Sequence, residues 1–159
     1  MIKVAEALPL SIFLVYIRMI DTSVELNWKA PFIASGLAAV FAIVFPLCRR
    51  TVLSRIFLGI NLYLISGAAA FIFHQWWVNT LYGRLKASGM LMWVAVTGIG
   101  SILLSKKGFT GVDSSDDRSI KKYSCGLVFI ALVTSLVSLG FQGNPVLSQI
   151  VPFGTLFLM

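Results

Sequence analysis

Charged residues are scarce in this chain of 159 residues, and acidic residues are the scarcest. Charged side chains make up 12% of the sequence, with six Asp and Glu against 13 Lys and Arg. A soluble domain has about 25% charged and about 45–50% apolar residues. This chain is 58% apolar, with a mean hydropathy of +0.90. The composition therefore excludes an ordinary soluble domain, and it also excludes a disordered chain, which lacks apolar residues.

Residues that carry chemistry are equally few. Two cysteines, Cys48 and Cys125, cannot hold together a disulfide scaffold, and no pair or cluster has the spacing of a metal site. We interpret both as small buried or interfacial residues. His74 is the single histidine, and no nucleophile elbow, nucleotide-binding loop or zinc signature is present. The sequence predicts no catalytic residue, no cofactor and no metal.

What the sequence has is long stretches without any Asp, Glu, Lys or Arg. A hydrocarbon core of about 30 Å needs about 20 apolar helical residues. In lipid each backbone amide must bond within its own segment, so such stretches form helices. Four stretches are long enough, and we expect each to span a membrane: 31–48, 56–73, 87–105 and 123–141.

The two end segments are less regular. Residues 4–20 are apolar except for Glu6 and Arg18, and we expect a short first span there rather than a cleaved signal peptide, because no small-residue cleavage site follows. After a turn signal at Pro145, the run 146–159 predicts either a sixth span or a hydrophobic end at the membrane surface.

The predicted fold class is therefore an all-α integral membrane protein. It is a polytopic bundle of five or six transmembrane helices with short loops, forming a single domain over 1–159.

Basic residues indicate the orientation of the bundle. With alternating crossings, nine of the 13 Lys and Arg fall on the side of the N-terminus. Because cytoplasmic loops are enriched in Lys and Arg, we expect the N-terminus in the cytoplasm of a bacterial inner membrane. The basic loops are expected to lie against anionic lipid head groups, and nucleic acid is not an expected partner.

A few polar and aromatic residues are candidate contacts for a partner or ligand. Asn61 is the most central polar residue of a span, where asparagine bonds a neighbouring helix or a ligand. Arg18 and Asp21 are three positions apart and are expected to pair. His74 is either an interfacial residue or a proton-exchanging group at the mouth of a cavity, aided by Asn79, Arg84 or Lys86. Around it stand the aromatic belt residues Trp76 and Trp77, with Arg84 further on.

Small residues recur at helical spacing in four of the expected spans. Small side chains let helix backbones approach closely in a membrane. They predict either packing inside the bundle or an interface with another membrane protein. The pairs are Ser35 and Ala39, Ser66 and Ala70, Thr97 and Ser101, and Thr134 and Ser138.

Two segments resemble the bacterial septation-protein-A-like family of inner-membrane proteins. The first is the opening Leu8-Pro9-Leu10 with Phe13, Tyr16 and Asp21, and the second is the Gly-containing span that ends in Phe71-Ile72-Phe73-His74. The chain departs from the family after His74, where Gln75-Trp76-Trp77 stands in place of a Lys-Trp-Lys-Pro-Thr-like stretch. The resemblance implies a non-enzymatic polytopic protein tied to envelope synthesis or division.

Three functions follow as hypotheses. The first is a non-catalytic accessory or scaffold subunit of an envelope complex, which binds other membrane proteins or itself through small-residue helix faces. The second is a small transporter or lipid-handling protein with a polar path near Asn61, His74 and Arg18. The third is a membrane enzyme that uses His74.

Overall fold

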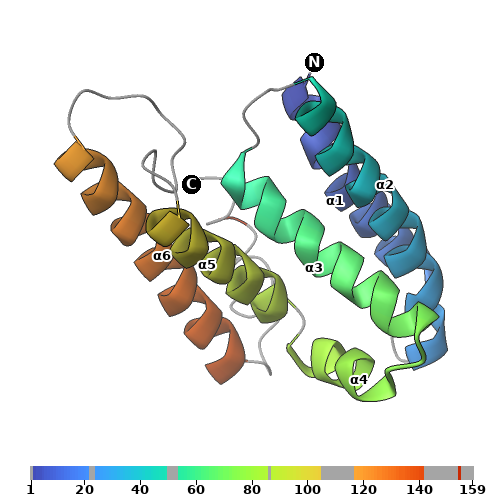
Figure 1. Cartoon of the computed structure of the whole chain (residues 1–159). Helices are drawn as coiled ribbons and strands as arrows, with labels where there is room; N and C mark the ends of the chain where they lie inside the picture. Colours follow the sequence, from blue (N-terminus) through green and yellow to red (C-terminus); the bar gives the residue numbers. More distant parts are fainter. Residues whose placement is uncertain are drawn as a thin grey trace. The chain divides into compact units, whose positions relative to one another are not determined.

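The computed structural model describes residues 2–21, 24–49, 54–85, 87–104, 117–141 and 154, and this part of the chain is all-helical. Each predicted span within it forms a helix, as expected where apolar residues run for five turns. A short 3-10 turn, η1 (Glu25–Trp28), precedes α2. The six α-helices are α1 (Ile2–Met19), α2 (Lys29–Cys48), α3 (Arg55–Ile72), α4 (Trp76–Leu85), α5 (Ala87–Leu104) and α6 (Asp117–Gly140) (Figure 1).

Three described helices are long and apolar enough to cross a membrane: α2, α3 and the Tyr123–Gly140 part of α6. The number rises to four if α4 and α5 together count as one broken span. The 18-residue α1 is more charged, since it contains Lys3, Glu6 and Arg18. The prediction of a helical protein with several candidate spans is confirmed, and the predicted 146–159 span lies outside the described residues.

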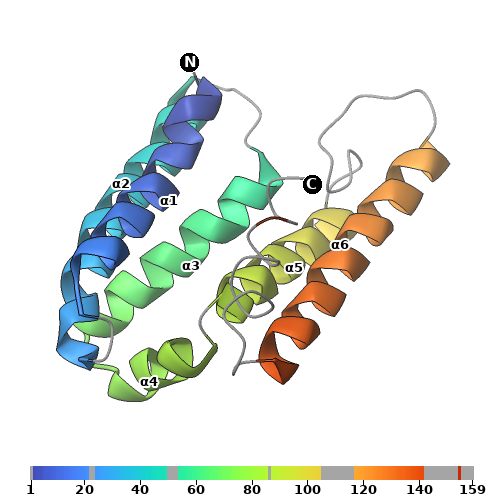
Figure 2. The same ribbon diagram turned by 180° about the vertical axis from the view of Figure 1, so that it is seen from behind.

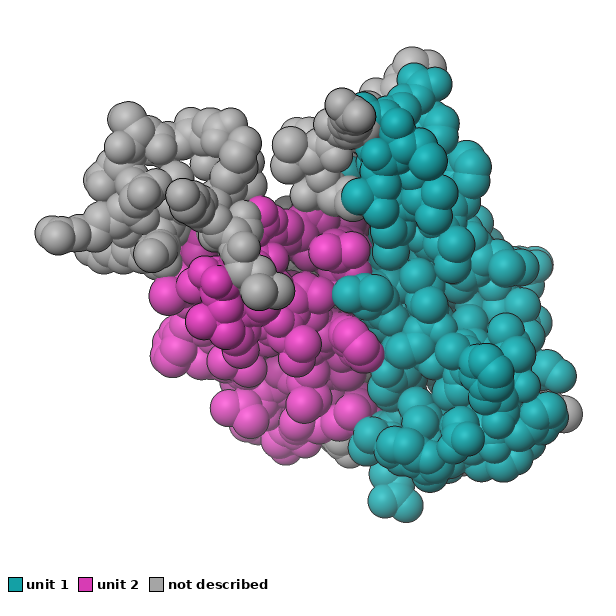
Figure 3. Space-filling view, in the orientation of Figure 1, with its two compact units in different colours: residues 1–53, 60–84 teal, residues 54–59, 85–159 magenta. Residues whose placement is uncertain are grey.

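The chain divides into two compact units (Figure 3). Unit 1 comprises residues 1–53 and 60–84, and unit 2 comprises residues 54–59 and 85–159. Helix α3 therefore contributes its first turn to unit 2 and its remainder to unit 1. The single domain over 1–159 remains a prediction, and each unit is described by itself below.

In unit 1, α1 packs along α2, and α2 packs closely on α3 (Figures 1 and 2). A Cβ atom placed on Gly36 of α2 would lie 2.5 Å from the Cβ of Ala68 and 3.3 Å from the carbonyl oxygen of Leu64. Only glycine allows the two backbones to come this close, as is common between membrane helices.

In unit 2, α5 packs along α6, and the first turn of α3 packs on α5. A Cβ atom on Gly59 would lie 2.7 Å from the Cα of Val94 and 2.7 Å from Oγ1 of Thr97. The hydroxyl of Ser135 on α6 donates a hydrogen bond of 3.3 Å to the carbonyl of Ser88 on α5. Unit 2 thus uses a glycine contact and an interhelical hydrogen bond.

Helix α2 separates its side chains by size. Small residues such as Ser35 and Ala39 are fully buried, whereas large apolar residues such as Leu37 and Phe41 are exposed at 68% and 64%. A soluble protein rarely exposes a continuous apolar face of this kind. The pattern suits a helix with close helix packing on one side and lipid on the other.

Helix α6 follows the same rule, with Ser124, Ala131 and Ser138 buried and Phe129 and Leu136 exposed. It begins at Asp117, so the helix starts six residues before the predicted span 123–141.

Both cysteines are free, and both are exposed on the described chain. Of the two alternatives predicted for Cys48 and Cys125, burial is therefore excluded, and the interfacial position stays a prediction.

Candidate functional site

An aromatic cluster in unit 1 is the best-defined candidate site, and Phe32 of α2 is its centre. The Phe32 ring is buried and lies 5.0 Å from the ring of Phe13, 5.7 Å from Tyr63 and 5.8 Å from Phe71, measured between centroids. All these pairs are tilted, the arrangement that the aromatic quadrupole favours. The cluster therefore joins α1, α2 and α3 through one side chain.

Helix α4 is attached to this cluster by Tyr82. Its ring lies 4.8 Å from the ring of Tyr63, and its hydroxyl forms a hydrogen bond of 2.7 Å with the hydroxyl of Ser66 on α3. The Ser66 hydroxyl also donates to the carbonyl of Tyr63 at 2.8 Å, which leaves the Tyr82 hydroxyl as the donor to Ser66. This bond fixes the position of a short helix with no buried residue of its own.

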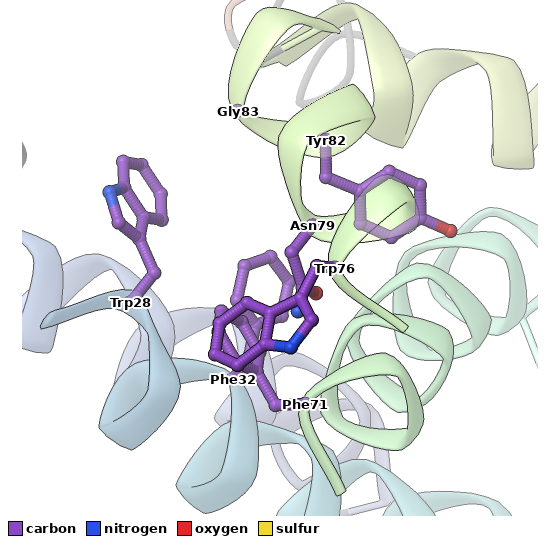
Figure 4. Close-up of a pocket in the computed structure, with 7 residues that line it drawn as sticks. All are labelled: Trp28, Phe32, Phe71, Trp76, Asn79, Tyr82 and Gly83. Atoms are coloured by element: carbon purple, nitrogen blue, oxygen red, sulfur yellow. The ribbon is translucent and has the colours of Figure 1, made fainter. Parts of the chain in front are cut away.

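A small pocket opens where α4 meets the beginning of α2 and the end of α3 (Figure 4). Its volume is about 40 Å³. Phe32 and Phe71 are buried at its base, while Trp28 and Trp76 stand at opposite sides of the opening. The complete lining is Trp28, Phe32, Phe71, Trp76, Asn79, Tyr82 and Gly83, none of which carries a charge.

Asn79 is the one side chain of the lining that offers an amide. Both its amide nitrogen and its amide oxygen are buried and have no hydrogen-bond partner among the described residues. A buried polar group without a partner costs about 1–3 kcal/mol. Trp76 lies one turn earlier on the same face of α4 and is half-exposed. The pocket therefore contains an unused donor and an unused acceptor.

The outward face of α4 carries further aromatic surface. Trp77 is 68% exposed, and its indole nitrogen donates a hydrogen bond of 3.0 Å to the side chain of Gln75. Arg84 is exposed in the last turn, where a positive charge interacts favourably with the helix dipole. A helix of ten residues is too short to cross a bilayer, and this composition is typical of a helix at the membrane interface.

His74 ends α3 rather than lining the pocket. Its backbone has φ of 55°, and the amide of Gln75 bonds the carbonyl of Ala70 at 2.8 Å. This is the geometry of a left-handed helix C-cap, a position that usually holds glycine. The imidazole is exposed, and its ring centroid lies 6.3 Å from that of Trp76. The position suits an interfacial turn residue.

Asn61 is fully buried in α3, and neither of its amide atoms has a hydrogen-bond partner among the described residues. The expected bond to a neighbouring helix is therefore absent from that part of the chain. Asn61 lies about three turns, or roughly 16 Å, before the end of α3 at Ile72, so it is remote from the pocket.

Arg18 lies in the last turn of α1, and Asp21 lies just after this helix, before η1. Helix α1 ends at Met19, so Asp21 is outside the helix and the two residues are not on one helical turn as expected. Both are exposed, and the backbone carbonyl of Asp21 accepts a hydrogen bond of 3.0 Å from the Asn27 amide. This bond stabilises the turn between α1 and α2.

Of the predicted contact residues, the structure places Trp76 in the pocket and leaves Trp77, His74 and Arg84 on the neighbouring surface. The sequence analysis missed Trp28 and Phe32. Their position in the chain could have identified them, because the beginning of one predicted span and the end of the next span lie on the same side of a membrane.

The residues described in the structure contain no group of three or more His, Cys, Asp or Glu that could hold a metal ion. Comparison with known proteins adds no assignment: no family model, no curated protein and no solved structure is significantly similar to this chain.

Proposed function

We propose that this chain is a bacterial inner-membrane protein that acts as a non-catalytic subunit of a cell-envelope complex. Five of its helices, α1, α2, α3, α5 and α6, would span the membrane, with a sixth span over 146–159 as the alternative arrangement. The excess of Lys and Arg on the side of the N-terminus favours a cytoplasmic N-terminus. The family resemblance described above points in the same direction.

The inclusion of α1 as a span is supported by how its charges lie. Glu6 is buried, so its carboxylate is withdrawn from the face that lipid would contact. Arg18 is exposed within one turn of the helix end, from which its long side chain can reach the interface. Neither residue therefore prevents insertion of the helix.

The observation that carries the proposal is the distribution of side-chain size on α2 and α6. Most of their small residues are buried inside each unit, and large apolar side chains make up most of their outward faces. Partner contacts are therefore proposed for these outward faces and for the exposed aromatic surface of α4, rather than for the small-residue faces. A chain this small leaves much of each helix to face either lipid or another membrane protein.

Site-specific photocrosslinking in native membranes tests this function. A photoreactive residue at Leu136 on α6 or Phe41 on α2 is expected to capture a defined partner, whereas one at the buried Ala131 or Ala39 is not. A lone monomer in mild detergent, together with no crosslinked product from either outward position, would contradict the proposal.

A second candidate function is a small transporter or lipid-handling protein, and the observation in its favour is the buried Asn61 amide without a partner. A path to the exposed His74 or Arg18 would have to follow most of α3. Asn61→Cys followed by a water-soluble thiol reagent tests it in the Cys48→Ser, Cys125→Ser background. Labelling from either side supports a path, and protection from both sides removes it.

An enzyme that uses His74 is the third candidate. His74→Ala would then abolish the activity of the enzyme. If cells carrying this substitution grew as well as cells with the unchanged protein, this candidate would be removed.

A further inference from the structure

We propose that the aromatic pocket of unit 1 binds an alkylammonium group, supplied in a membrane by the choline or ethanolamine head group of a zwitterionic phospholipid. The site is formed by Trp28 at the end of η1, Phe32 near the start of α2, Phe71 near the end of α3, and Trp76 and Asn79 from α4. It is separate from the outward faces of α2 and α6 proposed for partner proteins, and it adjoins the exposed surface of α4.

The rings explain the preference for a cation. The face of an aromatic ring is negative, and several rings around one cation form the cage that recognises quaternary ammonium groups. Phe32 and Phe71 provide a buried base, and the more exposed Trp28, Trp76 and Tyr82 provide walls that a ligand can reach. An anion would find no positive side chain in this lining.

The Asn79 amide explains why the ligand is more than a bare cation. Its oxygen can accept a hydrogen bond from an ethanolamine ammonium, and its nitrogen can donate to an ester or phosphate oxygen. Both atoms are without a partner among the described residues. A ligand that moves the half-exposed Trp76 aside would satisfy groups that the protein itself leaves unsatisfied.

The location explains why a lipid head group is the source. The pocket lies at one end of α2 and α3, both long and apolar enough to span a membrane, beside the exposed Trp77. Arg84 follows the lining residue Gly83 and is exposed, where a lipid phosphate would meet it. The uncharged lining suits the ammonium group of a zwitterion, and the exposed Lys29, which follows the lining residue Trp28, is a second cation beside the site. The lipid source rests on the proposed membrane location, whereas recognition of the ammonium group does not.

Tryptophan fluorescence of the purified full chain in a maltoside detergent tests the proposal. With Trp77→Phe and Trp93→Phe, the two remaining indoles, Trp28 and Trp76, both line the pocket. The probes are choline chloride against sodium chloride at equal ionic strength, and phosphatidylcholine against phosphatidylglycerol with identical acyl chains at equal mole fraction. We expect saturable changes in emission with choline and with phosphatidylcholine, and none with phosphatidylglycerol.

Variants connect the signal to the site. Trp28→Leu keeps an apolar wall but removes a ring face. We expect this variant to have a measurably lower affinity for choline, by up to about 5-fold, as for loss of one cation–π contact. Asn79→Leu is expected to weaken phosphatidylcholine binding more than choline binding. Leu81→Ala, on the exposed face of the same helix, is the matched control and should change neither affinity.

Each outcome is decisive for one part of the proposal. Saturation by phosphatidylcholine at lower concentrations than choline assigns the site to a lipid head group, and equal affinities assign it to a free alkylammonium ion. Equal or tighter binding of phosphatidylglycerol, an unaltered affinity in Trp28→Leu, or no saturable change with either ammonium probe would overturn it. Failure of partner crosslinking would leave these titrations unaffected, so the two proposals fail separately.

Discussion

Both units bring helices together at a glycine, Gly36 in unit 1 and Gly59 in unit 2, but only unit 1 has an aromatic cluster among its described residues. Unit 1 gathers aromatic rings around Phe32 and attaches the short helix α4 through a Tyr82–Ser66 hydrogen bond. Unit 2 brings α3 against α5 at Gly59 and joins α5 to α6 by the Ser135 hydroxyl. The pocket lies beside the aromatic cluster, and its lining includes the cluster residues Phe32, Phe71 and Tyr82.

The largest expected effect comes from removing the centre of the aromatic cluster. Phe32→Ala should destabilise unit 1 by about 3 kcal/mol, because a buried aromatic side chain leaves a cavity that its neighbours fill only in part. Thermal unfolding in detergent measures this change. Phe41→Ala, on the exposed face of the same helix, is the control and should cost well under half as much. Equal effects would mean that the cluster contributes no specific packing.

The glycine contact of unit 2 can be broken separately. Gly59→Ala should destabilise by about 1–3 kcal/mol, because its Cβ would meet the backbone of Val94 rather than a flexible side chain. Gly100→Ala is the control, since nothing lies within 4 Å of its Cβ position, and it should stabilise the helix by up to about 1 kcal/mol. Thermal unfolding of both variants in detergent measures the difference. A neutral Gly59→Ala would contradict close backbone packing.

The buried amide of Asn61 provides an intermediate effect of opposite sign. Asn61→Leu should stabilise the protein by about 1–2 kcal/mol, because it removes an amide without partners and has a similar shape. Ser66→Ala should instead destabilise by about 1 kcal/mol, because it removes the partner of the Tyr82 hydroxyl. Chemical denaturation compares the two variants. A destabilised Asn61→Leu would indicate that the amide is bonded in the membrane.

The smallest effect is expected at the end of α3. His74→Gly should stabilise by up to about 1 kcal/mol, because glycine adopts positive φ without steric cost. His74→Val should destabilise by a similar amount, since a β-branched residue disfavours this conformation most. Thermal unfolding distinguishes the pair, and equal stabilities would contradict the left-handed cap.

The apolar stretches allowed the helices to be predicted closely, but the residues between them were harder to interpret. The predicted spans 31–48 and 56–73 agree with α2 and α3 to within two residues. In lipid, a charge-free segment satisfies its backbone hydrogen bonds only by forming a helix. The sequence analysis predicts no helix where α4 lies, since ten residues with a weak apolar pattern form a helix only when tertiary contacts such as Tyr82–Ser66 support it.

Side-chain roles were the least predictable part of the site. His74 was a candidate for proton exchange because it is the single histidine, yet its positive φ places it in the C-terminal cap of α3. Phe32 looked like any other apolar residue of a span, and only the approach of α1, α3 and α4 makes it the centre of a cluster.

The sequence by itself determined that this chain is made of apolar helices, because local composition decides whether backbone amides can be bonded in the absence of water. Only the tertiary structure decided which face of each helix is buried and where a pocket forms. Those outcomes depend on which side chains of distant segments come into contact, and the local sequence does not specify such long-range contacts.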